Sequence, residues 1–138
     1  MNRPFSKALK CLQDGSLRPT RQRLALAKLL FEGGNHHVTA EALHNEVNSA
    51  GSKVSLATIY NTLHQFTGAG LLKEVVVDSR STYFDTNVED HHYLFFGEDG
   101  LLIDLPLEEI TISSLPDVPK GTKIVSVNVV VYMENQKA

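Results

Sequence analysis

Residues 55–67 read SLATIYNTLHQFT. The apolar side chains of this stretch recur at spacings of three, four and three residues, at Leu56, Ile59, Leu63 and Phe66. This spacing places them on one face of an amphipathic α-helix, and we expect that face to be buried. Ser55 is a suitable N-cap residue, and Gly68 and Gly70 are suited to end the helix.

The opposite face of this predicted helix carries small and polar side chains, at Ala57, Thr58, Tyr60 and Asn61. Small residues allow a helix to enter the major groove of DNA closely, and hydroxyl and amide groups can hydrogen-bond base edges or phosphates. The positive N-terminal end of the helix, near Ser55, favours a phosphate. A solvated polar face on an ordinary amphipathic helix is the alternative interpretation.

The sequence around this helix predicts a winged helix-turn-helix. Apolar periodicity indicates three earlier helices, over residues 4–14, about 20–31 and about 39–50. Thr20 and Thr39 are the expected caps of the second and third of these. Downstream, two β-rich runs at 71–77 and 82–85 flank a polar turn, which is typical of a hairpin.

Positive charge concentrates in the first half of the chain. Residues 1–73 hold nine Lys/Arg against four Asp/Glu, a net of +5, whereas residues 74–138 hold four against twelve, a net of −8. This asymmetry indicates a polyanionic partner for the first half, although uneven surface charge is the alternative. We expect Arg18, Arg21 and Arg23 to bind backbone phosphates and Arg80, at the hairpin tip, to contact the minor groove or a phosphate.

The second half predicts a small α/β domain. Residues 92–96 and 101–105 read as a second hairpin, residues 107–114 as a poor helix and residues 124–133 as a strand. The last strand is apolar on both faces, so we expect cover on both sides, partly from a dimer partner. The chain is thus expected to be α+β, with a winged-helix domain over 1–85, a hinge over 86–90 and an α/β dimerisation and effector domain over 91–138.

Two adjacent histidine pairs suggest a metal site. His37 precedes the third helix, Asp85 ends the hairpin, and His91 and His92 begin the second domain. Imidazole and carboxylate groups bind Fe²⁺, Mn²⁺ and Zn²⁺, so a site built from these places would couple a divalent metal to the orientation of the DNA-binding domains. The alternative is that His36, His91 and His92 are exposed or only hydrogen-bonded.

Composition excludes several classes of protein. Cys11 is the single cysteine, which excludes an internal disulfide and a cysteine-rich zinc site. The sequence shows no membrane-spanning apolar run and no secretory signal, so we expect a cytoplasmic protein. Because the sequence has no H-E-x-x-H motif, Gly-rich phosphate loop or nucleophile motif, we do not expect an enzyme, although a metallohydrolase built on the histidine pairs is one hypothesis.

Several of these segments also resemble the ferric uptake regulator (Fur) superfamily: NHHVTAE at 35–41 and LATIYNTL at 56–63. Others are similar to its iron response regulator (Irr) branch: YFDTN at 83–87, DHHY at 90–93 and VNVVV at 127–131. The resemblance covers nearly the whole chain. It implies a homodimeric repressor or activator that binds double-stranded promoter DNA and controls iron- or haem-related genes.

The resemblance also assigns roles to individual residues. It implies that Tyr60 contacts bases and that His37, Asp85 and His91 are metal ligands, with His92 at a neighbouring site. Haem is a second candidate effector, because the resemblance to the Irr branch implies haem binding at the histidine cluster. Tyr93 stands where relatives usually have histidine, and a tyrosinate can bind Fe³⁺ or haem. The main alternative function is a metal- or haem-binding carrier protein without specific DNA binding.

Overall fold

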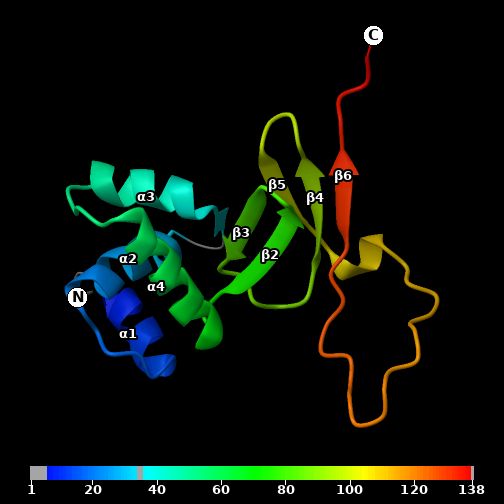
Figure 1. Ribbon diagram of the computed structural model, residues 1–138, viewed down its shortest axis with the longest axis horizontal. Coiled ribbons are helices and arrows are strands. Elements are labelled where there is room, and N and C mark those ends of the chain that lie inside the picture. Colours follow the sequence, from blue (N-terminus) through cyan, green and yellow to red (C-terminus); the bar gives the residue numbers. More distant parts are fainter. Residues whose placement is uncertain (1–5, 34–35, 138) are drawn as a thin grey trace. The chain divides into compact units, whose positions relative to one another are not determined.

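The computed structural model describes residues 6–33 and 36–137. Residues 4 and 5 of the first predicted helix, and Asn35 of the NHHVTAE segment, lie outside these ranges. The chain divides into two compact units, Met1–Val88 and Glu89–Ala138. Helices and two three-stranded sheets confirm the α+β fold class (Figure 1).

Four helices form most of the first unit: α1 (Ser6–Asp14), α2 (Arg21–Phe31), α3 (Ala40–Ser49) and α4 (Leu56–Gly68). The three predicted caps are present. The side-chain oxygens of Thr20, Thr39 and Ser55 accept hydrogen bonds from backbone N–H groups three residues later, at 3.2, 3.1 and 3.2 Å. Each cap satisfies a donor that the first turn of a helix leaves unpaired. No helix among the described residues is both long and apolar enough to cross a membrane.

The core of the first unit lies between these helices. Ile59, Leu63 and Phe66 on α4 are fully buried, and the Phe66 ring lies 6.0 Å from the Phe31 ring of α2. Leu56, expected on the same buried face, is instead 36% exposed. It has the correct helical phase, but it is the first residue of α4 and lies outside the buried core cluster.

Two turns of the first unit depend on glycine. Gly51, after α3, has φ +97°, and Gly70, after α4, has φ +80°. At both places a later N–H bonds back into the last helical turn: Ser52 to the Val47 carbonyl and Leu71 to the Phe66 carbonyl. Glycine adopts this left-handed conformation without the Cβ clash that other residues meet, so it suits both chain reversals.

The wing is the predicted hairpin, β2 (Lys73–Asp78) and β3 (Ser81–Asp85). A two-residue strand, β1 (His37–Val38), was missed by sequence analysis and pairs antiparallel with β3. The sheet order is therefore β1-β3-β2. The pairing sets His37 directly opposite Asp85.

The second unit contains β4 (His92–Phe96), β5 (Leu101–Leu105) and β6 (Val130–Met133), in the order β5-β4-β6. The predicted β4–β5 hairpin is present with antiparallel pairing, and β6 runs parallel to β4. The short helix is reduced to a 3₁₀ turn at Leu107–Glu109. The β-branched residues that follow it, at 110–112, disfavour a longer helix.

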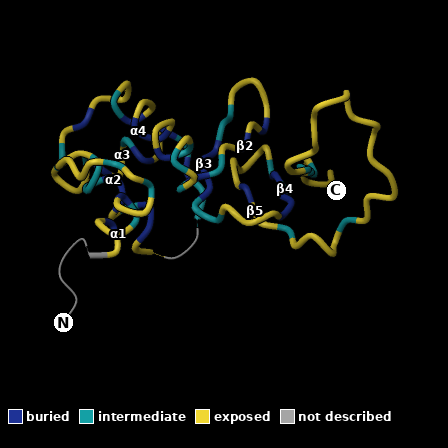
Figure 2. Tube along the Cα trace, turned by 90° about the horizontal axis from the view of Figure 1, so that it is seen from below, coloured by how far each residue is buried: buried dark blue, intermediate teal, exposed yellow. Residues whose placement is uncertain are grey.

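The strand expected over residues 124–133 is shorter than predicted, and in the single chain much of this segment is exposed. Only Val130–Met133 is paired, and Val125 is 84% exposed. In Figure 2 the trace over residues 111–126 is exposed throughout. The reason is that β6 pairs with only one neighbour, β4, so a single chain leaves this apolar segment without cover.

Candidate nucleic-acid interface and metal ligands

The exposed face of α4 presents the side chains expected to contact DNA. Ala57, Tyr60 and Asn61 are exposed, and Thr58 is half-buried. The Ser55 hydroxyl caps the helix and also donates to the Thr58 hydroxyl at 2.9 Å. These two residues therefore order the first turn of α4, from which the small side chain of Ala57 projects.

Tyr60 has a hydrogen-bond partner on another helix. Its hydroxyl donates to Oε1 of Glu41, in the first turn of α3, at 2.7 Å. This bond raises the pKa of the Tyr60 phenol and lowers the pKa of the Glu41 carboxyl, because it stabilises the protonated phenol and the ionised carboxylate. Sequence analysis missed Glu41, since nothing in its spacing to Tyr60 predicts the contact.

Aromatic contacts hold the same part of α4 against the wing. The Tyr60 and His64 rings are stacked with centroids 6.5 Å apart. The His64 ring in turn meets the Phe84 ring of β3 edge-on at 5.7 Å. A pocket of about 240 Å³ adjoins these side chains, and Arg80 also lines it. Arg80 is exposed at the wing tip, where its N–H donates to Asp78 Oδ1 at 2.8 Å.

The three arginines near α2 differ in their surroundings. Arg18 and Arg21 are exposed, whereas Arg23 is half-buried. The Arg23 guanidinium donates to the Arg18 carbonyl at 2.9 Å and to Oε1 of Gln65, on α4, at 3.0 Å. This geometry favours a role for Arg23 in holding α2 against α4.

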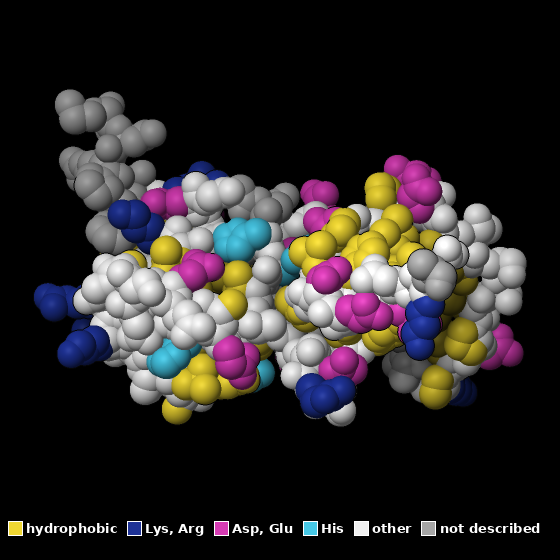
Figure 3. All heavy atoms as spheres, turned by 90° about the horizontal axis from the view of Figure 1, so that it is seen from above, with side chains coloured by type: hydrophobic (Ala, Val, Ile, Leu, Met, Phe, Trp, Pro, Cys, Tyr) yellow, Lys and Arg dark blue, Asp and Glu magenta, His cyan; other side chains and the backbone are white. Residues whose placement is uncertain are grey.

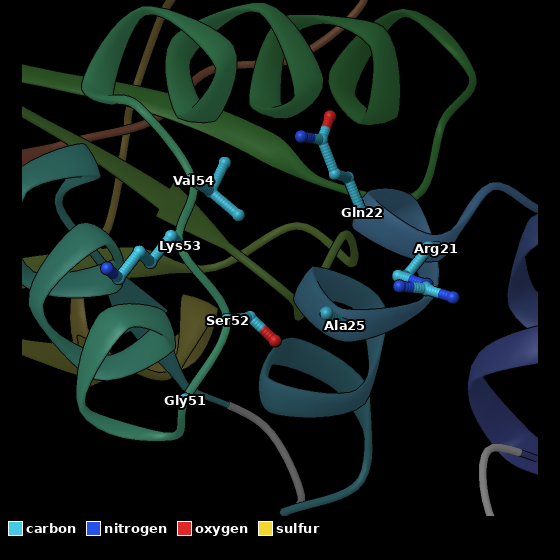
Figure 4. Close-up of a pocket in the computed structure, with 7 residues that line it drawn as sticks. All are labelled: Arg21, Gln22, Ala25, Gly51, Ser52, Lys53 and Val54. Carbon is cyan, nitrogen blue, oxygen red and sulfur yellow. The ribbon is translucent and has the colours of Figure 1, made fainter.

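A second pocket lies between the start of α2 and the loop before α4. It measures about 290 Å³ and is lined by Arg21, Gln22, Ala25, Gly51, Ser52, Lys53 and Val54. Figure 4 shows Arg21 projecting from α2 on one side and Lys53 from the loop on the other. The two cations flank a surface that could follow a phosphate backbone. Sequence analysis did not single out Lys53, although it lies in the basic half, two residues before the Ser55 cap.

In the first unit, the candidate metal ligands His37 and Asp85 are brought together by the β1–β3 pairing. Asp85 is buried, and its Oδ1 accepts the Asn87 N–H at 2.9 Å. The His37 ring meets the Tyr83 ring edge-on at 6.4 Å. Burial raises the pKa of the Tyr83 phenol, with a smaller contribution from Asp78, so Tyr83 is a neutral neighbour of His37.

In the second unit, His91 lies between two oxygen acceptors. Its Nδ1 is 2.7 Å from the Glu89 carbonyl and its Nε2 is 3.0 Å from Asp104 Oδ1. If Nδ1–H donates to the carbonyl, the Nε2 lone pair of the neutral ring faces a carboxylate. A backbone carbonyl on one ring nitrogen is the usual arrangement for a histidine whose other nitrogen binds a metal. Sequence analysis missed Asp104.

His92 has a different environment. Its Nδ1 accepts the Val129 N–H at 3.0 Å, and its side chain is 2% exposed. A neutral imidazole that accepts at Nδ1 carries its proton on Nε2, so neither nitrogen has a lone pair left for a metal. The geometry favours a structural role for His92, in joining β4 to the segment before β6.

Comparison with known proteins assigns the chain to a protein family. The model of the ferric uptake regulator family matches residues 14–132. The chain belongs to that family. This confirms the resemblance at the level of the Fur family, while the Irr branch stays a prediction.

Two relatives and one solved structure illustrate the similarity to this Fur-family chain. The ferric uptake regulation protein of Shigella flexneri is 35% identical over 81 residues, 59% of this chain. The peroxide-responsive repressor PerR of Staphylococcus aureus (strain Mu50 / ATCC 700699) is 27% identical over 106 residues, 77% of this chain. The matches span 55% and 71% of those two proteins.

The ferric uptake regulator of Pseudomonas aeruginosa, solved with manganese, superposes with a TM-score of 0.67 at 22% identity. The superposition covers 94% of this chain and 98% of that one. At this identity the likeness establishes the fold of the Fur-family chain.

Proposed function

We propose that the protein is a dimeric transcription regulator that binds double-stranded promoter DNA through α4 and responds to a divalent metal ion. The observation that carries this proposal is the exposed face of α4, with Ala57, Tyr60 and Asn61 turned outward beside a wing that ends in Arg80. The net positive charge of residues 1–73 supports a polyanionic partner.

A DNA-binding titration tests the proposal. Fluorescence anisotropy with AT-rich promoter fragments and with scrambled fragments, each with and without Mn²⁺, Zn²⁺ or haem, measures specific and non-specific affinity. A regulator binds the promoter fragments more tightly than the scrambled fragments in at least one of these conditions. Binding of metal or haem with equal, weak affinity for both fragments would instead identify a carrier protein.

The metal proposal draws on one histidine–aspartate pair in each unit. His37 and Asp85 are neighbours in the first unit, and His91 and Asp104 are in contact in the second. Nitrogen and oxygen donors of this kind suit Fe²⁺, Mn²⁺ and Zn²⁺. A divalent cation bound by ligands of this kind would couple metal binding to DNA binding.

Single substitutions separate ligands from structural histidines. We expect His37→Ala and His91→Ala to weaken metal binding by roughly 10–100-fold or more. Losing a residue that only supports a metal ligand has an effect of that size, so losing the ligand itself should cost at least as much. His92→Ala should mainly reduce thermal stability, and His36→Ala should do neither. Equal metal affinity in His37→Ala, His91→Ala and the unsubstituted protein would rule out these ligands.

The apolar surface of the second unit supports the homodimer. Its exposed apolar side chains include Leu101, Val125, Tyr132 and Met133, at 50%, 84%, 60% and 39% exposure. Figure 3 shows hydrophobic side chains gathered over one face of this unit. An exposed apolar surface of this kind is typical of a protein–protein interface.

We extend the proposal to two finer points, the control of iron- or haem-related genes and a response to haem. The sequence resemblance to the Irr branch is their basis, and Tyr93, fully buried beside the His91 ring at 4.6 Å, is the residue to test. A haem titration followed by absorbance, in the unsubstituted protein and in His91→Ala, distinguishes haem binding at this cluster from non-specific uptake.

A further inference from the structure

The Tyr60 hydroxyl donates a hydrogen bond to Glu41, and this bond has consequences for base recognition. We propose that Glu41 sets the base preference of Tyr60: by accepting the hydrogen bond of the phenolic O–H, it leaves the Tyr60 oxygen to act only as an acceptor toward DNA. Tyr60 would then recognise a base that carries an exocyclic amino group, adenine or cytosine. This inference rests on the proposed DNA binding by α4.

The geometry of the pair supports an oriented phenol. Glu41 lies in the first turn of α3 and Tyr60 in the second turn of α4, so the bond joins two elements that are each fixed by a capped N-terminus. The oxygen–oxygen distance of 2.7 Å is short, as charge-assisted hydrogen bonds are. His64 stacks on the Tyr60 ring and limits its movement.

The protonation states are consistent with that orientation. The bond to Glu41 raises the pKa of the Tyr60 phenol, so the phenol keeps its proton near neutral pH. The same bond lowers the pKa of Glu41, which therefore stays a carboxylate and can only accept. A phenol has a single proton, so its remaining hydrogen-bonding capacity is that of an acceptor.

The major-groove edges of the four bases differ in this respect. Adenine N6 and cytosine N4 are donors, whereas guanine O6 and thymine O4 are acceptors. An acceptor-only oxygen would be satisfied by the first two and would meet lone pairs on the others. At the base that Tyr60 contacts, we therefore expect adenine or cytosine to be preferred by about ten-fold, which corresponds to one hydrogen bond.

A base-analogue experiment tests this directly. Binding of the full chain, loaded with the metal that supports DNA binding, is measured on a promoter site selected from a random library. Tyr60→Phe first identifies the contacted base. If it is adenine, replacing it by purine, which lacks the 6-amino group, should weaken binding about ten-fold. In Glu41→Ala the preference for adenine or cytosine over guanine or thymine at that base should fall to about two-fold or less, because the phenolic proton can then turn outward and donate to guanine O6 or thymine O4.

Two further variants control for charge and folding. Glu41→Gln provides an amide oxygen for the phenolic proton and should keep the discrimination. Glu46→Ala removes a carboxylate from an exposed position of the same helix and should strengthen binding to all sites equally. Circular dichroism shows whether each variant is folded.

The outcomes separate the inference from the proposed function. A preference for guanine or thymine at the Tyr60 position, or equal discrimination in Glu41→Ala and the unsubstituted protein, overturns the role of Glu41 while leaving DNA binding intact. If the unsubstituted protein has no sequence preference, the proposed function itself fails. In a double-mutant cycle, Glu41→Ala should add nothing to the lost discrimination of Tyr60→Phe.

Discussion

Tyr60 and Glu41 show how much a single side-chain contact adds to a helix face. The Tyr60 ring is only 36% exposed, and its hydroxyl points to a carboxylate on α3. A tyrosine on a solvated helix face has no reason to adopt one orientation. Here a hydrogen bond to Glu41 and a stacked His64 ring give it one.

The raised pKa of the Tyr60 phenol allows the bond to Glu41 to be tested in the absence of DNA. We predict that Glu41→Ala lowers the pKa of Tyr60 toward the ordinary tyrosine value, because the acceptor that stabilises the protonated phenol is lost. NMR of ζ-¹³C-labelled tyrosine across an alkaline titration, assigned with Tyr60→Phe, measures this. An unchanged Tyr60 pKa in Glu41→Ala would show that the bond does not form in solution.

Burial distinguishes two leucines of α4 that share one helical face. Leu63 is fully buried, whereas Leu56 is 36% exposed. We predict that Leu63→Ala lowers the free energy of unfolding by roughly 2–5 kcal/mol, because it leaves a cavity in a closed core. Leu56→Ala should cost well under half as much. Urea denaturation of the two variants makes the comparison, and equal losses would contradict the burial described here.

At the level of elements, α2 and the loop before α4 form one basic surface, while Arg23 joins α2 to α4. Arg21 and Lys53 flank the pocket between them, and the Arg23 guanidinium is bonded to Gln65. Two cations beside an open surface can neutralise phosphates. A guanidinium bonded within the protein serves first to hold the two helices in position.

This difference predicts distinct salt dependences of DNA binding. Arg21→Ala and Lys53→Ala should each reduce the slope of log K against log salt by about 0.9, the value for one lost phosphate contact. Arg23→Ala should change the slope less and the thermal stability more. Anisotropy titrations at several salt concentrations provide the slopes, and a full unit of change in Arg23→Ala would assign that residue to the DNA backbone instead.

The second unit has a different balance of surface and core from the first. Its sheet has only three strands, and β6, at one edge, pairs with β4 alone. Tyr132 is 60% exposed on that strand although its ring meets Phe95 edge-on at 6.1 Å. A small unit that leaves so much apolar surface exposed gains burial by association.

We predict that Tyr132→Asp shifts the protein from dimer to monomer, because it would place a charge in a desolvated interface. Sedimentation equilibrium measures the association constant. Val76→Asp is the matched control: Val76 is also an exposed apolar strand residue, 63% exposed, but it lies on the wing. A dimer that persists in Tyr132→Asp would move the interface away from β6.

Local patterns accounted for most of the first unit. The periodicity of Ile59, Leu63 and Phe66, the three caps and both glycine turns are properties of a few neighbouring residues, so the sequence predicted them correctly. Strand β1 was missed because two residues carry no periodicity. The length of the last strand was overestimated, because apolar composition shows what could be buried and not which partner covers it.

The roles of individual site residues depended on contacts between distant parts of the chain. Residue types alone indicated a DNA-binding helix and histidine–carboxylate chemistry, since those follow from hydrogen-bonding groups and charge. Packing in three dimensions brought Glu41 to Tyr60, Gln65 to Arg23 and Asp104 to His91. Such pairs are separated by 13 to 42 residues in sequence, and only the folded backbone, which sets the helices and strands side by side, determines which side chains meet.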